Sequence, residues 1–441
     1  MAEPKRTEFS VRKERAVLVA VVLPGEDHGG EDILDELARL AETAGARVAE
    51  RITQKLSRID PRTYVGKGKA DELREVCQAV DADAIICDHD LSPGQIHTLE
   101  EITETKVVDR SELILDIFAT RAKTRQAKVQ VELAQLEYTY PRLTRMWSHL
   151  DRHGGGIGTR GPGERQLESD RRAFGRRMRD LRRELEAIAQ RKRRQVAARR
   201  EEFRVCLVGY TNAGKSTLLN ALTDADAFVE DRLFATLDTK TRVWHLDAGR
   251  EALLSDTVGF IRRLPHHLVA SFHATLEEAT EADLLLHVVD ISHPDCLHQA
   301  ETVRQVLEEI GCGDTPAILV FNKTDVAKPS SEAELLAASS ADAVRVSALH
   351  GEGLEALRRR VLDHVARRET RVTVHAHCTN GRLLASLHEF ATVLGTRRSD
   401  EHMVVEARIE PRHLPAVRSA AGPQDTIRVH DAAVPSGREA S

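Results

Sequence analysis

One segment of eight residues has the residue types and the spacing that hold a nucleoside triphosphate. It matches the pattern G-x-x-x-x-G-K-[ST] and comprises Gly209, Tyr210, Thr211, Asn212, Ala213, Gly214, Lys215 and Ser216. Its glycines allow backbone N–H groups to wrap the phosphates, Lys215 reaches the β- and γ-phosphates, and the Ser216 hydroxyl binds Mg²⁺. An apolar run at residues 204–208 precedes the segment and a helical pattern at 217–222 follows it, as this motif requires. The chain is therefore expected to bind a nucleotide with Mg²⁺ here.

A second motif predicts which base the site accepts. It follows the apolar run at residues 318–321 and comprises Asn322, Lys323, Thr324 and Asp325. Because the carboxyl ends of parallel strands face the ligand crevice, we expect this motif at the nucleotide. The Asp325 carboxylate can accept from guanine N1–H and the exocyclic amine, a pair of donors that adenine lacks, and Asn322 can join the base edge to the phosphate loop. A weaker motif is expected to contact the guanine through its backbone: Ser347, Ala348 and Leu349.

Two segments between these motifs are expected to sense the third phosphate. The later one comprises Asp256, Thr257, Val258 and Gly259. Its carboxylate can hold the Mg²⁺ sphere, and the Gly259 N–H can reach the γ-phosphate. The earlier one comprises Phe234, Ala235, Thr236, Leu237 and Asp238. We expect the Thr236 hydroxyl to complete the Mg²⁺ coordination, and Thr239 and Thr241 are the alternatives.

The predicted chemistry is attack of water on the γ-phosphorus, with GTP or GDP as the bound nucleotide. The predicted catalytic residues are Lys215, Thr236 and Gly259, and the predicted metal ligands are Ser216 and Thr236. Phe260 stands at the position where Ras-like enzymes use a glutamine to orient the attacking water. Because phenylalanine cannot hydrogen-bond a water, we expect slow intrinsic hydrolysis that a partner stimulates.

These motifs lie on alternating strand and helix patterns over residues 203–367, which predict an α/β fold. The strand candidates at 205–208, 284–289 and 318–321 are continuous apolar runs, as in strands covered on both faces. The pattern predicts a P-loop GTPase domain with a doubly wound, mostly parallel sheet.

Two units are predicted before this domain. Residues 1–110 alternate strand and helix patterns and predict an N-terminal α/β domain. Residues 111–202 carry apolar residues at spacings of three and four and predict a long antiparallel helical hairpin. Its tip, at about residues 148–166, is rich in glycine and is expected to be an irregular binding loop.

Two units are predicted after it. Residues 368–420 predict a small C-terminal α/β domain, with strands at 372–375 and 403–409 around a helix at 382–393. Residues 421–441 contain prolines and glycine and predict a mobile tail.

Composition excludes several classes of protein. With 41% hydrophobic residues, 30% charged residues and a mean hydropathy of −0.37, the 441-residue chain is neither disordered nor collagen-like. The longest apolar run, at residues 16–23, is far shorter than the roughly 20 residues that span a bilayer, so we expect a cytoplasmic protein without membrane insertion. The net charge is −6, yet residues 171–200 hold 13 basic and 3 acidic residues. This basic helix indicates either a contact with a polyanion or a solvated helix face.

Stretches outside the nucleotide motifs resemble the HflX family, ribosome-associated GTPases of the Obg–HflX group. They are residues 66–69, 113–118, 131–135, 155–163 and 166–168. The resemblance spans residues 16–367, and the family usually has threonine where this chain has Arg165. It implies binding to the large ribosomal subunit in the GTP state and, in some members, separation of the two subunits during stress. The hairpin tip and the basic helix would then contact ribosomal RNA.

Three alternatives remain at this stage. The two lysines among residues 66–69 could form a weak second nucleotide site, although a basic turn that contacts RNA or opens a helix at Ala70 is the simpler interpretation. The chain could be an RNA-binding regulatory GTPase that does not depend on the ribosome. It could also be an ATP-using phosphotransferase, against which Asn322 and Asp325 argue.

Overall fold

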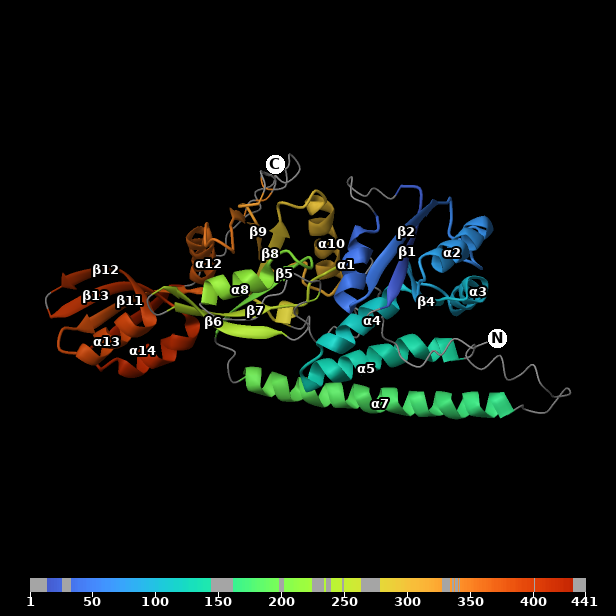
Figure 1. Ribbon diagram of the computed structural model, residues 1–441. Coiled ribbons are helices and arrows are strands. Elements are labelled where there is room, and N and C mark those ends of the chain that lie inside the picture. The colour runs from blue at the N-terminus through green and yellow to red at the C-terminus, as the bar shows by residue number, and fades with distance from the viewer. Residues whose placement is uncertain are drawn as a thin grey trace, which may run out of the picture.

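The computed structural model describes most of the chain. The described residues are 14–25, 33–143, 162–197, 202–223, 234, 239–247, 250–262, 278–326, 334, 337, 340, 342–399 and 401–430. They form an N-terminal α/β unit, a pair of long helices, a GTPase-type α/β domain and a C-terminal α/β domain (Figure 1). No helix within these ranges is long and apolar enough to cross a membrane.

The N-terminal unit is a parallel sheet with helices on both faces (Figure 1). Its strands lie in the order β2 (Arg47–Lys55), β1 (Arg15–Val22), β3 (Ala84–Cys87) and β4 (Lys106–Val108). Because side chains alternate along β1, Leu18 and Val19 enter different cores. The first core packs against α1 (Asp35–Ala44) and α4 (Arg110–Arg121), and the second against α2 (Lys67–Ala79) and α3 (Pro93–Thr103).

Helix α4 corrects one predicted boundary. Residues from 111 onward were expected in the helical hairpin. Every residue from Arg110 to Phe118 is buried, and the apolar ones pack into the N-terminal core with α1. A helix covered on all sides belongs to a core, so the hairpin begins only at α5 (Arg125–Thr139).

The hairpin pairs α5 with α7 (Pro162–Ala197), as the apolar spacing predicted (Figure 1). Val129, Leu133 and Leu181 are buried along the seam. Residues 148–161 of the expected tip lie outside the described part of the chain, whereas 162–166 are helical and not irregular. Proline suits the first position of a helix, because its missing N–H is not needed there. The prediction of an irregular loop up to residue 166 rested on the glycines and overlooked this helix start.

The third domain has a six-stranded sheet that is parallel except at one edge. Its order is β10 (Ala343–Arg345), β9 (Ala317–Asn322), β8 (Leu284–Asp290), β5 (Phe203–Gly209), β7 (Arg250–Asp256) and β6 (Lys240–Asp247), and only β6 is antiparallel. Its described helices include α8 (Lys215–Thr223), α10 (Cys296–Glu309) and α12 (Leu354–Arg368). This is the doubly wound, mostly parallel architecture that the sequence predicted.

The C-terminal domain is an antiparallel sheet with its helices on one face (Figure 1). In chain order it contains β11 (Thr370–His377), α13 (Gly381–Phe390), β12 (Ala391–Ser399), β13 (His402–Ile409), α14 (Leu414–Ala420) and β14 (Thr426–His430). The predicted helix therefore ends at Phe390 and gives way to a strand. The predicted tail is also wrong up to His430, because the β-branched residues Ile427 and Val429 pair with β11. Residues 431–441 lie outside the described part.

Candidate functional site: a guanine nucleotide pocket

The phosphate loop leaves the carboxyl end of β5 and leads directly into α8. Gly214 has φ 92°, a conformation that L side chains rarely adopt, and a Cβ there would lie 2.2 Å from Asn322 Nδ2. Gly209 is equally constrained, because a Cβ would lie 2.3 Å from the carbonyl oxygen of Val288. These contacts explain why the motif needs glycine at both positions.

Lys215 lies at the centre of this loop, where phosphates would bind. Its side chain is buried, and Nζ donates to the carbonyl oxygens of Gly209 at 3.0 Å and Tyr210 at 2.7 Å. Burial lowers the pKa of Lys215 to about 8, although the nearby Asp256 carboxylate opposes this effect. A phosphate group would replace these carbonyl partners with negative charge and favour the protonated amine.

The oxygen atoms expected to hold Mg²⁺ meet beside the loop. Ser216 Oγ donates to Asp256 Oδ2 at 2.6 Å, and Asp256 is fully buried. A hydroxyl next to a carboxylate is a donor set that suits Mg²⁺. The third expected ligand, Thr236, lies outside the described residues, as do Ala235, Leu237 and Asp238. Within the described part, no group of three or more His, Cys, Asp or Glu residues could hold a metal ion.

Asn322 joins the base-binding motifs to the phosphate loop. Its Nδ2 donates to the carbonyl oxygen of Ala213 at 2.9 Å, and its Oδ1 accepts from the Ala348 N–H at 3.0 Å. The side chain is 2% exposed, so both bonds are made away from water. One amide thus fixes the phosphate loop relative to the segment expected to contact guanine.

Asp325 is held in place for the base by Ser347. Ser347 Oγ donates to Asp325 Oδ1 at 2.5 Å, and this hydrogen bond lowers the pKa of the carboxyl. The carboxylate is therefore charged at neutral pH and can accept two hydrogen bonds from guanine. Leu349 is 72% exposed, so this end of the segment makes no buried contact in the described structure.

The other two residues of the Asn322–Asp325 motif have backbone and ion-pair roles. Lys323 has φ 64° and its Nζ lies 2.6 Å from Asp290 Oδ2, at the end of β8. The Thr324 N–H donates to the carbonyl oxygen of Val346 at 3.4 Å. The partner Asp290 was not predicted, because no local spacing connects it to the motif.

The segment after β7 packs tightly beneath the phosphate loop. A Cβ on Gly259 would lie 2.7 Å from Thr211 Cα and 2.9 Å from Lys215 Nζ. Thr257 Oγ1 donates to the carbonyl oxygen of Leu207 at 2.7 Å. Phe260 is 2% exposed and exchanges backbone hydrogen bonds with the loop, so its ring cannot orient a water.

Tyr210 connects the phosphate loop to the N-terminal unit, a role that the motif did not reveal. Its hydroxyl donates to the Glu36 carboxylate of α1 and accepts from the Arg262 N–H at 2.7 Å. Glu36 also pairs with Arg110, whose Nη2 donates to the Arg262 carbonyl oxygen at 3.0 Å and whose Nη1 donates to Asp88 at 2.6 Å. Burial of Tyr210 beside Glu36 raises the pKa of its hydroxyl. A small pocket adjoins this cluster and is lined by Glu36, Arg39, Tyr210, Thr211, Asn212 and Arg262.

The side chain of Phe234 lies in a contact between two domains. Its ring is 2% exposed and packs edge-on against Phe118 of α4, with ring centroids 4.6 Å apart. Val258 and Ile261 join the same N-terminal core. The side chains of Phe234 and Val258 therefore serve the domain contact, and the nucleotide contacts expected of these two residues stay a prediction for their backbone.

His287 of β8 is a second residue that the sequence did not reveal. It is buried in the described structure, and burial together with the charge of Lys215 lowers its pKa to about 4. The imidazole is therefore neutral at physiological pH and adds no charge near the phosphates.

Residues 66–69 open a helix. Gly66 is the N-cap of α2 and its N–H donates to Gln54 Oε1 at 2.8 Å, while Lys69 pairs with Glu72 at 2.8 Å. This geometry agrees with the simpler interpretation and offers no specific support for a second nucleotide site.

Comparison with known proteins matches most of the chain to families of GTP-binding proteins. Residues 31–119 match the GTP-binding GTPase N-terminal family, residues 121–199 the GTP-binding GTPase middle region and residues 204–323 the 50S ribosome-binding GTPase family. A GTPase HflX from Lacrimispora saccharolytica is 50% identical over 353 residues, which are 79% of this chain and 82% of the relative. One from Escherichia coli is 47% identical over 316 residues, which are 71% and 74%.

Among solved structures, the chain is similar to a GTP-binding protein from the archaeon Sulfolobus solfataricus in complex with GDP. The identity is 24% and the TM-score 0.43, over 80% of this chain and 98% of that one. The pocket, the matched regions and the identity to curated relatives agree, and we conclude that the chain belongs to the HflX family of GTPases.

Proposed function

We propose that this GTPase binds the large ribosomal subunit in its GTP state and separates or rescues stalled ribosomes under stress. GTP hydrolysis would be stimulated by the ribosome and would release the protein. The observation that carries the proposal is a stripe of arginines on α7, the helix that leads directly into β5 and the phosphate loop. Support also comes from the match to the 50S ribosome-binding GTPase family.

The stripe runs along the side of α7 opposite α5. It comprises Arg172, Arg176, Arg179 and Arg183, all exposed and spaced three or four residues apart. Arg172 and Arg183 form exposed ion pairs within α7, with Glu168 and Asp180. Arg177 and Arg182 instead pair with the α5 carboxylates Glu132 and Glu137. Part of the basic charge thus joins the two helices, and the stripe remains to contact RNA phosphates.

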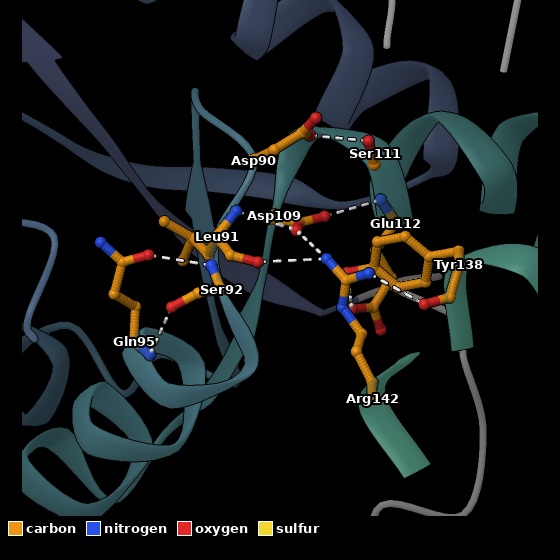
Figure 2. Close-up of polar contacts among 9 residues, drawn as sticks. All are labelled: Asp90, Leu91, Ser92, Gln95, Asp109, Ser111, Glu112, Tyr138 and Arg142. Atoms are coloured by element: carbon orange, nitrogen blue, oxygen red, sulfur yellow. Dashed lines mark hydrogen bonds and ion pairs between the residues drawn. The ribbon is translucent and has the colours of Figure 1, made fainter. Parts of the chain in front are cut away.

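Contacts just after α5 fix the helical hairpin to the N-terminal unit. Arg142 ends the α5 side and donates to the buried carboxylate of Asp109 at 3.2 Å and to the Leu91 carbonyl oxygen at 3.1 Å (Figure 2). Its guanidinium lies 3.5 Å from the centre of the Tyr138 ring. Asp109 also accepts from the backbone N–H groups of Leu91 and Glu112, so several elements meet at one carboxylate.

Hydrolysis would use the residues assembled around the phosphate loop. Lys215 and the loop N–H groups would stabilise negative charge on the transferred phosphoryl group. Ser216 and Asp256 would hold Mg²⁺, which when bound neutralises charge between the β- and γ-phosphates. Because Phe260 is buried, no side chain at that position orients water, and the ribosome would complete this part of the site.

Co-sedimentation tests the proposal. Purified large subunits are pelleted with the protein in the presence of GDP or a non-hydrolysable GTP analogue, and we expect binding with the analogue only. The double substitution Arg176→Glu and Arg179→Glu should weaken that binding at least tenfold, because two phosphate contacts are reversed. The matched control, Arg359→Glu with Arg367→Glu on α12, should bind normally.

Each result has a clear meaning. Absence of co-sedimentation with either nucleotide, with binding to RNA retained, would favour the regulatory GTPase that does not need the ribosome. Equal binding with both nucleotides would contradict the dependence on GTP. Subunit separation is then measured by sucrose-gradient profiles of intact ribosomes after addition of the protein and GTP.

A further inference from the structure

The C-terminal sheet has one face that no helix covers. The chain runs β-α-β-β-α-β with the strand order β12-β13-β11-β14, and α13 and α14 lie together on one face (Figure 1). Alternate residues of β11, such as Val372 and Val374, are buried against these helices. Arg371 and Thr373 therefore lie on the opposite face, which we name the open face.

Strand pairing places a group of basic side chains on the open face. One row across the sheet contains His430, Arg371 and Arg408, which pair directly. The next rows add Arg428, opposite Thr373, and Arg397, opposite Val404. The described open face also holds the histidines His375, His377 and His402.

The balance of charge on this face is strongly positive. Glu406 is the one carboxylate on the paired open-face positions of the four strands. It lies 2.9 Å from Arg371, and that hydrogen bond, with the charges of Arg371 and Arg397, lowers the pKa of Glu406. One carboxylate cannot balance four arginines, so the face attracts a polyanion.

The composition of the face narrows the class of partner. Val404 is the only aliphatic side chain among its paired positions, and no Phe, Tyr or Trp lies there. Leu394, at the bulge of β12, is 47% exposed, and a single exposed leucine does not form an apolar patch. A protein partner needs an apolar or aromatic centre, and a membrane surface needs apolar anchors. Single-stranded RNA read by its bases needs free stacking platforms, whereas the rings of His377 and His402 pack edge-on against each other and His430 hydrogen-bonds to Thr373. Arginines without these groups suit phosphates of folded RNA.

We propose that the open face of the C-terminal sheet is an RNA-binding surface that contacts the phosphate backbone without reading sequence. This surface is separate from the stripe on α7, and the matched family regions end at residue 323, before the domain begins. The four arginines supply the contacts, because an arginine can donate two hydrogen bonds to one phosphate. The surface acts in either nucleotide state, since it does not involve the phosphate loop.

Salt dependence of RNA binding tests the proposal with the full-length protein. The ligand is a fluorescently labelled RNA duplex of about 20 base pairs, titrated at several salt concentrations without nucleotide. The double substitution Arg397→Ala and Arg428→Ala should lower the slope of log affinity against log salt by about two, one for each phosphate contact. The stripe on α7 contributes equally to the wild type and to the variant, so the difference between their slopes measures the contribution of the open face.

Two matched variants control this measurement. Arg382→Ala with Arg418→Ala removes the same charge from exposed positions on the helical side of the domain and should leave the slope unchanged. Arg397→Lys with Arg428→Lys keeps the charge and should retain most of the slope. GTP hydrolysis by each variant should equal that of the wild type and shows that the chain is folded.

An unchanged slope in the alanine variant of the open face would overturn the proposal, as would an equal fall in the helical-side control. Unchanged RNA binding with lost binding to ribosomal subunits would also overturn it, in favour of a protein partner. Because the RNA duplex is tested without ribosomes or GTP, failure here is distinguishable from failure of the proposed function.

Discussion

We expect guanine selectivity to depend on a single carboxylate, that of Asp325. Asp325→Asn replaces one of the two carboxylate oxygens that would accept hydrogen bonds from guanine. Hydrogen bonds to charged groups contribute about 1.5–3 kcal/mol. We expect GTP to bind about 10- to 100-fold more weakly and the preference for GTP over ATP to fall, as measured by competition with a fluorescent GDP analogue. Asp314→Asn, an exposed carboxylate of the same domain, should change neither value. Unchanged selectivity would contradict the base assignment.

Lys215 predicts proton uptake on nucleotide binding. Without nucleotide its pKa is about 8, so at pH 9 the amine is mostly neutral. Phosphates beside Nζ raise the pKa, and binding must then take up close to one proton at pH 9 and almost none at pH 7. Calorimetric titration of GDP in two buffers of different ionisation enthalpy measures this number. Equal uptake at the two pH values would show that the lysine is already charged in the empty pocket.

Single residues also show what the sequence could and could not predict about the site. The phosphate loop and the Asn322–Ala348 connection follow local motifs whose order fixes their place on parallel strands. The Tyr210–Glu36–Arg110 cluster joins residues far apart in the chain, so no local sequence pattern predicts it. Phe234 lies next to the expected switch threonine, and its burial against Phe118 depends on a domain contact that sequence alone does not contain.

Among the elements, α1 and α4 are held to the nucleotide domain by a buried charge. The Arg110 side chain is 3% exposed and bonds to Glu36, Asp88 and the Arg262 backbone. Arg110→Met leaves the buried Asp88 carboxylate and the half-buried Glu36 carboxylate without their cation and should lower the free energy of unfolding by about 3–5 kcal/mol. Urea unfolding checks this value. Arg304→Met, which breaks exposed ion pairs on α10, should cost less than about 1 kcal/mol.

The elements were predicted well where periodicity was strong. The seam of α5 and α7 follows the apolar spacing, because a two-helix contact repeats along its whole length. Strand β14 was missed because its five residues follow proline and glycine and are mostly exposed, and a short edge strand has little hydrophobic pattern. Helix α4 was assigned to the wrong unit, since periodicity identifies a helix but not the core it joins.

For the whole molecule, the shared core predicts communication between the nucleotide and the N-terminal unit. Val258 and Ile261 follow the Asp256 carboxylate and pack into the core of α4. Exchange of GDP for a non-hydrolysable GTP analogue should therefore change amide hydrogen exchange in α4, because we expect the segment after β7 to respond to the γ-phosphate. Mass spectrometry of the exchanged peptides measures this effect. The central strands of the C-terminal sheet, β11 and β13, serve as the internal control and should exchange identically with both nucleotides.

The length of α7 has a mechanical consequence. Its 36 residues extend about 54 Å at 1.5 Å per residue, and its carboxyl end joins β5 through only a few residues. Because α5 packs against α7 along their seam, the two helices would turn as one body, and a turn of about 5° near β5 would displace the far end of α7 by about 5 Å. Hydrolysis of one phosphate bond moves the atoms of the pocket only slightly. We expect the resulting displacement at the far end of α7 to be large enough to push apart two surfaces that meet there.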